Sequence, residues 1–175
     1  MNTLLKNPAR KLFFLMLLAT SILSSCGIYS FSGASIPPEM KTVSVQFFEN
    51  NAPLVVPYLS QQFTEDLKAR IRNQSRLSLV RSDADANFEG RITDYRISPA
   101  AIQGNERAGL ERLTITVLGK YTNVLKPELN FEQSFTRFKD FSTQAKSLQA
   151  QEPELVKDVN TQLTEDVFNK AFANW

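Results

Sequence analysis

The sequence holds few side chains of the kinds that perform chemistry. It contains no histidine and a single cysteine, Cys26. Without histidine the chain lacks the usual general base, the commonest metal ligand and the usual activator of a serine or cysteine nucleophile. No G-x-S-x-G, P-loop or G-x-G-x-x-G motif occurs. We therefore predict that the protein is not an enzyme and that it holds no metal and no cofactor.

Carboxylates remain as the one route to catalysis. Glycoside hydrolysis needs only two acids, about 5 to 10 Å apart. The acids near the longest predicted loop are Glu89, Asp94, Glu106 and Glu111. No spacing singles out a pair among them, and surface acids are the default explanation. A carboxylate-only hydrolase stays an alternative that substitution of these four residues would test.

The cysteine stands where a bacterial lipoprotein is cleaved and acylated. It lies in the sequence Leu23-Ser24-Ser25-Cys26-Gly27, after an apolar run over residues 12–23 and after three basic residues, Lys6, Arg10 and Lys11. A basic start, a short apolar segment and small residues before the cut are typical of a secretory signal. The run is too short for a transmembrane helix, which needs about 20 apolar residues. We predict a signal peptide over residues 1–25 and lipidation of Cys26 by a diacylglycerol thioether and an N-acyl chain such as palmitate. A chance cysteine near an ordinary cleavage site is the alternative.

Cleavage before Cys26 changes the size and charge of the chain. It removes 25 of 175 residues and leaves 150, enough for one domain with a single core. Lys+Arg falls from 20 to 17 while Asp+Glu stays at 18, so the net charge changes from +2 to −1. This balance does not favour nucleic-acid binding. With Cys26 acylated, no disulfide forms within the chain. The predicted organisation is a signal over 1–25, an acylated tether over 26–40 and a domain over 41–175.

Hydrophobic periodicity places strands and helices alternately along the domain. Residues 42–48 alternate with Val43, Val45 and Phe47 on one face, which predicts a strand. A helix over about 57–73 follows, with an apolar stripe, and then a short strand at 77–80. Residues 86–97 predict a longer strand whose apolar face changes parity near Thr93-Asp94, as at a β-bulge, with Gly90 marking a close approach of the helix layer.

The second half predicts a hairpin pair and a final helix. A long connection over 98–111 leads to a strand over 113–122, a turn at 126–128 and a strand over 129–141. Pro153 is expected to open the last helix, and Trp175 at the chain end is expected to dock on the domain. These elements predict an α+β two-layer sandwich, with two helices packed on one face of a mainly antiparallel sheet of about four strands. The other face of the sheet is polar and would meet water or a partner.

Several segments together resemble a known family, the LptE-like lipopolysaccharide-assembly lipoproteins, in particular their Bacteroidetes branch. The resemblance covers nearly the whole mature chain, and single words such as Cys-Gly are less specific than their order and spacing. The segments that carry it are residues 26–33 (CGIYSFSG), 43–48 (VSVQFF), 59–65 (LSQQFTE), 88–95 (FEGRITDY) and 164–175 (TEDVFNKAFANW).

The resemblance implies an outer-membrane lipoprotein that faces the periplasm. In that family the domain plugs the lumen of a large β-barrel, LptD, and helps to insert lipopolysaccharide into the outer leaflet. Proteobacterial members carry a basic residue soon after Cys-Gly, but Ser30-Phe31-Ser32 stands here, so their lipopolysaccharide-contacting residues are not transferred. A generic periplasm-facing adaptor or glycan-binding module is the alternative function. Candidate contacts to barrel acids or lipid A phosphates, on the outer sheet face and the 98–111 loop, are Arg91, Arg96, Arg107, Arg112, Arg137 and Lys139.

Overall fold

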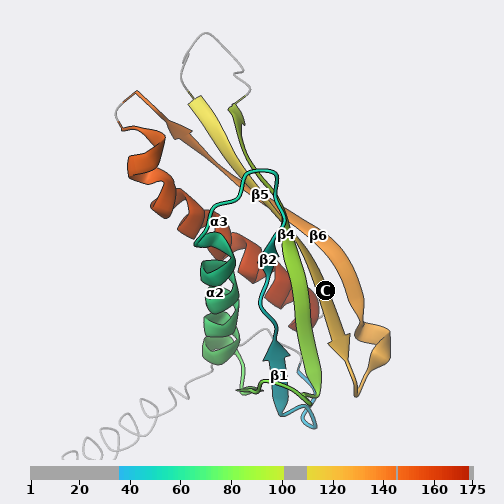
Figure 1. Cartoon of the computed structure of the whole chain (residues 1–175). Coiled ribbons are helices and arrows are strands. Elements are labelled where there is room, and N and C mark those ends of the chain that lie inside the picture. The colour runs from blue at the N-terminus through green and yellow to red at the C-terminus, as the bar shows by residue number, and fades with distance from the viewer. Residues whose placement is uncertain (1–35, 101–109, 145, 174–175) are drawn as a thin grey trace, which may run out of the picture. The chain divides into compact units, whose positions relative to one another are not determined.

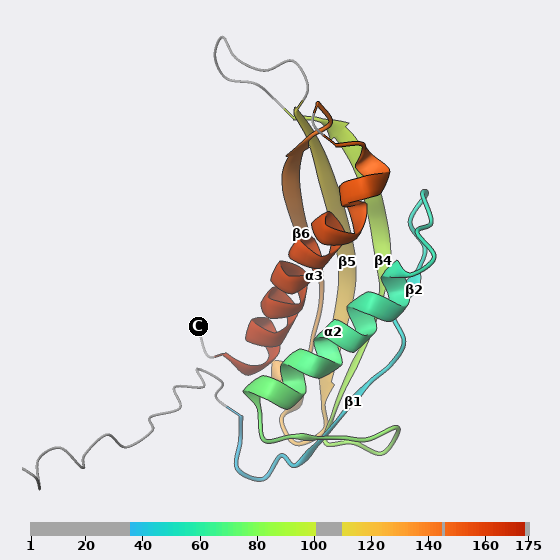
Figure 2. The ribbon, with the colours of Figure 1, turned by 90° about the vertical axis from the view of Figure 1, so that its left-hand side faces the viewer.

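The computed structural model describes residues 36–100, 110–144 and 146–173, and its elements are shown in Figure 1. The predictions for Cys26, Glu106, Arg107 and Trp175 therefore lie outside the described residues. The strands are β1 (Thr42–Val45), β2 (Glu49–Asn50), β3 (Ser78–Leu79), β4 (Ala86–Pro99), β5 (Leu110–Asn123) and β6 (Phe131–Ser142). The helices are α2 (Leu59–Gln74), α3 (Leu148–Phe172) and the 3-10 turn η1 (Pro127–Leu129). Figure 2 shows α2 and α3 side by side on one face of the sheet.

The sheet combines a parallel part and an antiparallel part. Its strand order in the described residues is β3-β1-β4-β5-β6, with β2 also paired to β4. The three long strands β4, β5 and β6 form an antiparallel meander, as predicted. The short strand β1 runs parallel to both β3 and β4, because α2 returns the chain to the start of the sheet. The predicted α+β class is confirmed, although the sheet has six strands where about four were expected.

The first predicted strand ends early, and this changes which phenylalanine is buried. β1 stops at Val45, and the strand is interrupted until β2 begins at Glu49. Phe48 is fully buried with its ring centroid 5.0 Å from that of Phe63, whereas Phe47 is 58% exposed. The Phe48 N–H donates to Thr64 Oγ1 of α2 at 3.1 Å, a bond to the helix layer in place of a strand partner. The prediction that Phe47 faces the core was therefore wrong.

Both helices bury the predicted stripes but begin elsewhere. In α2 the stripe Leu59, Phe63, Leu67 and Ile71 is fully buried, and the helix starts at Leu59, after Pro57. α3 starts at Leu148, so Pro153 lies inside its second turn and does not open it. The sequence did not predict the first turn of α3 because most of its side chains are polar. Its position is held by Gln151 Nε2, which donates to the carbonyls of Ser142 and Lys146 at 3.0 and 3.1 Å.

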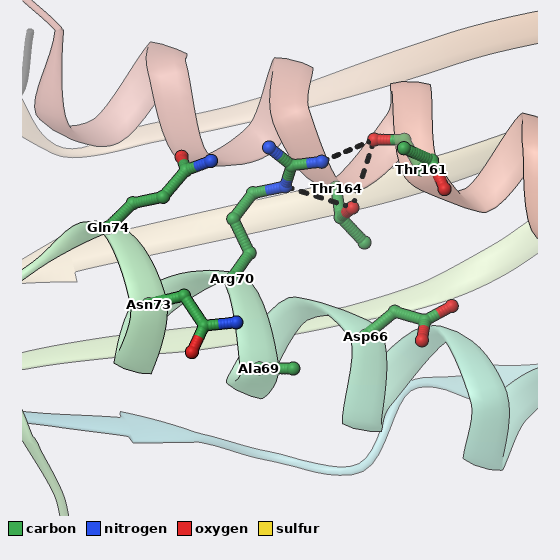
Figure 3. A pocket seen from close by; sticks show the side chains of 7 residues that line it. All are labelled: Asp66, Ala69, Arg70, Asn73, Gln74, Thr161 and Thr164. Carbon is green, nitrogen blue, oxygen red and sulfur yellow. Dashed lines mark hydrogen bonds between the residues drawn. The ribbon is translucent and has the colours of Figure 1, made fainter. Parts of the chain in front are cut away.

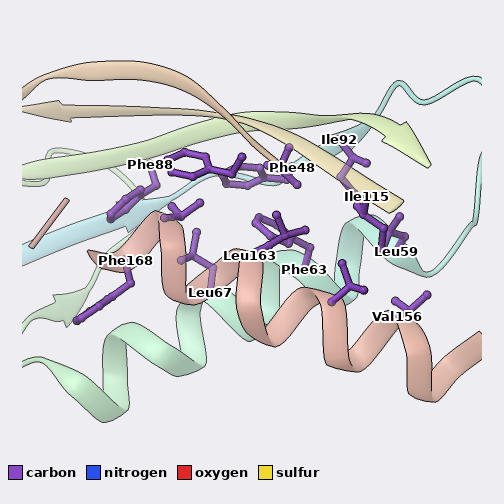
Figure 4. Close-up of a cluster of buried hydrophobic side chains, with 14 of the residues drawn as sticks. Phe48, Leu59, Phe63, Leu67, Phe88, Ile92, Ile115, Val156, Leu163 and Phe168 are labelled. Atoms are coloured by element: carbon purple, nitrogen blue, oxygen red, sulfur yellow. The ribbon is translucent and has the colours of Figure 1, made fainter. Parts of the chain in front are cut away.

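The core fills the space between the sheet and the two helices (Figure 4). The predicted change of parity in β4 is confirmed, because the β4–β5 register shifts between Ile92 and Asp94 and Tyr95 returns to the core side. Gly90 is a site of close approach, but not to a helix. A Cβ at Gly90 would overlap the ring of Phe48 and the carbonyl oxygen of Leu118 on β5. The expected contact with the helix layer is therefore replaced by one with the β1–β2 connection.

Candidate partner-binding surface

The face of the sheet opposite the helices is the surface on which the sequence placed its candidate contacts. We call it the open face (Figure 2). The strand register lines up side chains in three rows across this face. Each row holds one side chain from β4, one from β5 and one from β6. These rows are Arg91, Leu118 and Ser134; Asp94, Thr116 and Thr136; and Arg96, Thr114 and Phe138. Thr116 and Thr136 hydrogen-bond through their hydroxyls at 3.0 Å, so the middle row is uncharged and polar over β5 and β6, with Asp94 beside it on β4.

One predicted arginine of the open face is already engaged. Arg112 Nε and NH2 donate to the two oxygens of Asp140 at 2.6 and 2.9 Å, a two-pronged pair across β5 and β6. The guanidinium carbon also lies 3.7 Å from the centre of the Phe138 ring. Hydrogen bonds from Arg112 hold the pKa of the Asp140 carboxyl below its usual range. The charge of Arg112 is therefore already neutralised by Asp140 and is not available to a partner in the way a free cation would be.

Arg91 and Arg96 are the more available cations of the open face. Arg96 is 64% exposed and pairs loosely with Asp94, with 3.3 Å between NH1 and Oδ2. Arg91 is exposed and forms no ion pair among the described residues. An ion pair at the surface is worth about 0 to 1 kcal/mol. An anionic partner can therefore replace Asp94 beside Arg96 at little cost.

The two basic residues predicted on β6 lie on the other side of the sheet. Arg137 donates to both oxygens of Asp166 at 2.5 and 2.6 Å, and Lys139 Nζ lies 3.0 Å from Asp158 Oδ2. Both acids belong to α3. Arg137 and Lys139 are thus on the helix side, and the hypothesis that placed them on the outer face is corrected. The sequence held a signal for this: they share strand parity with Phe135 and Phe141, which are buried.

Glu89 and Asp94, two of the candidate catalytic acids, do not form a pair in the structure. Glu89 is bound by Asn87 Nδ2 at 2.6 Å and by Lys120 Nζ at 3.3 Å. Asp94, which pairs with Arg96, lies five positions beyond Glu89 on the same strand. At about 3.3 Å per residue that separation is roughly 16 Å, beyond what two carboxylates of a glycosidase span. No metal-binding cluster of acids occurs in the part of the chain that the structure describes.

The sequence did not reveal a polar hollow between the two helices, shown in Figure 3. Arg70 reaches from α2 to α3, donating from NH2 to the Thr161 carbonyl at 2.8 Å and from Nε to Thr164 Oγ1 at 3.2 Å. Its NH1 is 3.9 Å from Glu165 Oε2. The hollow has a volume of about 220 Å³ and is lined by Asp66, Ala69, Arg70, Asn73, Gln74, Thr161 and Thr164. Because Arg70 is held on three sides, it serves to join the helices.

Comparison with known families decides where this domain belongs. Residues 40–171 match the LptE family, described as lipopolysaccharide-assembly. The chain belongs to this family. The match runs from the buried Met40 to the last turn of α3, so it includes the whole described sheet and both of its faces. LptE proteins are lipopolysaccharide-assembly lipoproteins and not enzymes, which confirms the prediction that this chain is not an enzyme. Comparison with curated proteins gives no match.

Solved structures share the fold of this LptE-family chain at low sequence identity. A minor lipoprotein from Acinetobacter baumannii is 14% identical, with 75% of this chain and 91% of that chain covered and a TM-score of 0.51. A hypothetical protein from Chlamydia trachomatis is 8% identical, with 77% and 99% covered and a TM-score of 0.52. A protein from Xanthomonas campestris is 11% identical, with 78% and 91% covered and a TM-score of 0.50. These likenesses concern the fold alone.

Proposed function

We propose that the protein is anchored in the outer membrane through acylated Cys26, faces the periplasm, and acts as the plug and assembly partner of an LptD β-barrel. In this role it assists the transport of lipopolysaccharide and its insertion into the outer leaflet. The observation that carries the proposal is the family match over residues 40–171. The predicted cleavage and acylation sequence of residues 23–27 supports the anchor, which the family description does not itself supply.

The chemistry of the domain supports a role inside a partner. The lumen of a large outer-membrane barrel is polar, so a plug must present polar side chains to it. The open face offers threonines at its centre and arginines around them. No helix among the described residues is long and apolar enough to cross a membrane. Within this face, Arg91 and Arg96 are the proposed contacts to barrel carboxylates or lipid A phosphates.

A comparison of two sets of alanine substitutions tests the contact surface. The open-face set is Arg91→Ala with Arg96→Ala, and the matched set is Arg137→Ala with Lys139→Ala, whose side chains pair with α3. We expect the open-face set to lose co-purification of the barrel and bound lipopolysaccharide from mild-detergent extracts, with an unchanged melting temperature. The matched set should lower the melting temperature instead. Full retention of barrel and lipopolysaccharide by the open-face set would refute the assignment.

A second experiment tests the anchor separately. Cys26→Ala removes the only thiol that can be acylated. We expect the variant to leave the acylated membrane fraction while the domain stays folded, because the core of the described domain begins only at Ile36 and Met40. Continued fractionation with membranes in the acylated form would contradict the anchor. A native pull-down that yields a partner other than a large β-barrel would favour the adaptor or glycan-binding alternative.

A further inference from the structure

The outer edge of β6 presents main-chain groups that no described element pairs with. β6 ends the strand order of the sheet, next to β5 (Figure 1). The N–H of Ala100 donates to the carbonyl oxygen of Leu110, so the even-numbered residues of β5 turn their main-chain groups toward β4 and the odd-numbered ones toward β6. The β5–β6 register pairs odd-numbered with odd-numbered residues. The even-numbered residues of β6 therefore direct their N–H and C=O groups away from the sheet.

Five exposed residues make up this outer edge, and they are Glu132, Ser134, Thr136, Phe138 and Asp140. No hydrogen bond within the described residues reaches their main-chain N–H or C=O groups. Because every second residue faces outward, the donors recur about every 7 Å along the strand. A row of alternating donors and acceptors with this spacing matches the edge of another extended chain, as in recognition by β-strand addition.

A groove lies beside this edge on the helix side. It has a volume of about 470 Å³ and is lined by residues 133–137 of β6 and by Asp166, Asn169 and Lys170 of α3. A strand added along the edge would set alternate side chains in this groove, between β6 and α3. The edge therefore has both parts of a strand-addition site, a main-chain row that gives affinity and a side-chain groove that gives selectivity.

The cations beside the edge decide which kind of segment fits. Arg137 and Lys139 are already paired with Asp166 and Asp158 of α3. An added strand would therefore not leave these two cations buried without a partner. Lys170 is exposed and forms no ion pair among the described residues. The groove thus carries one cation in excess, which favours a segment with a carboxylate on its helix-facing side.

A second copy of the chain fits this edge less well. Two β6 strands related by a twofold axis would form one continuous sheet with both helix layers on the same side. That side would then carry the excess charge of Lys170 twice. Resting on the proposed role as a plug, we infer that the β6 edge accepts an extended, acidic segment of the surrounding barrel protein as an added strand. The segment hydrogen-bonds to the even-numbered residues of β6 and sets a carboxylate beside Lys170.

A pair of substitutions at one position tests the main-chain contact. Ser134→Pro removes an outward N–H, which an edge strand tolerates because that group takes no part in the β5–β6 ladder. Ser134→Ala keeps the N–H and is the matched variant. The readout is the barrel that co-purifies with the full-length lipidated protein from mild-detergent extracts. We expect Ser134→Pro to recover about threefold to tenfold less barrel than Ser134→Ala, at a similar melting temperature.

A charge reversal tests the groove without touching β6. Lys170→Glu places a like charge beside the expected carboxylate and should recover about threefold less barrel than the unsubstituted protein. Arg72→Glu is the matched control, because Arg72 and Lys170 are each the basic residue in the last turn of their helix. It should recover as much barrel as the unsubstituted protein. This pair also decides the question if Ser134→Pro lowers the melting temperature.

Hydrogen exchange at single-residue resolution identifies what covers the edge. The isolated full-length lipidated protein is compared with its barrel complex. We expect the N–H groups of Ser134, Thr136 and Phe138 to exchange at least about tenfold more slowly in the complex. Slow exchange in the dilute isolated protein would overturn the inference, because another segment of the same chain would then cover the edge. Slowing that appears when the isolated protein is concentrated would overturn it in favour of a second copy.

The outcomes separate this inference from the function on which it rests. If the unsubstituted protein recovers no barrel, the proposed function fails, and the assigned occupant fails with it. The plug stands and the strand addition is refuted if barrel is recovered but the three N–H groups exchange as fast in the complex as in isolation. Full retention of the barrel by both Ser134→Pro and Lys170→Glu refutes the strand addition in the same way.

Discussion

Substitution of Gly90 by alanine gives a sharp test of how the sheet and the β1–β2 connection pack. The added Cβ would overlap two groups, the Phe48 ring and the Leu118 carbonyl oxygen. The carbonyl belongs to the β4–β5 ladder and cannot move without stretching strand hydrogen bonds. Phe48 is fully buried against Phe63 and has no free space to enter. Overpacking of a core costs about 1 to 3 kcal/mol, and two simultaneous overlaps place Gly90→Ala at about 3 kcal/mol.

The assay is urea unfolding followed by circular dichroism, with thermal melting in parallel. At about 2 to 4 °C per kcal/mol for a domain of this size, the melting temperature should fall by roughly 6 to 12 °C. Gly119→Ala is the matched control. Its Cβ would meet Phe135 Cε2 at 3.3 Å, a much longer approach than either overlap at Gly90 and one to a side chain instead of a backbone carbonyl. Adding Phe48→Leu to Gly90→Ala should recover part of the loss. If Gly90→Ala costs no more than Gly119→Ala, the packing argument is wrong.

Two further predictions concern the helix pair and alkaline pH. Arg70→Ala should lower the free energy of unfolding in urea by about 1 to 3 kcal/mol, because Thr161 and Thr164 lose a charged hydrogen-bond donor. Arg72→Ala, on the exposed side of α2, is the control and should change this free energy little. Equal effects of the two substitutions would exclude an inter-helix role for Arg70. Burial raises the pKa of Tyr121 to about 12, above the value of about 10 for an unfolded tyrosine. The stability gained by keeping this phenol protonated is complete below about pH 10 and is lost as pH rises from about 10 to 12. Tyr121→Phe should therefore make the decline of the urea midpoint in this window shallower, and an unchanged decline would refute the assignment.

Hydrophobic periodicity predicts this fold correctly where a regular helix or strand buries side chains at constant spacing over several residues. The stripe of α2 and the change of parity in β4 were both predicted correctly, because each involves side chains whose burial repeats along a regular element. Periodicity fails where the backbone leaves regular geometry. Between Val45 and Glu49 the alternation continues in the sequence but not in the structure, and Phe48 takes the place predicted for Phe47.

The start of α3 shows a different limit. Residues 148–152 carry mainly polar side chains and precede a proline, two features that favour a loop in the sequence. The structure extends the helix through Pro153, the sixth residue of α3, although a proline there cannot donate to the carbonyl four residues earlier. Gln151 fixes the first turns by donating to the carbonyls of Ser142 and Lys146. A single side-chain hydrogen bond of this kind does not appear in the hydrophobic pattern of the sequence. The parallel pairing of the short strands is missed for a similar reason, since two to four residues give too short a pattern.

The charges of β6 show why residue type alone does not define a binding surface. β6 is an edge strand of 12 residues, and an exposed edge of this length invites pairing with other chains. Charged side chains directed toward the helix layer are one way in which natural sheets prevent such pairing. Arg137 and Lys139 point that way and are tied to Asp166 and Asp158 of α3. Their charges are therefore neutralised by α3, and the predicted cations that stay available on the open face are Arg91 and the loosely paired Arg96. A partner that reads charge on this face must therefore dock over β4, away from the edge strand.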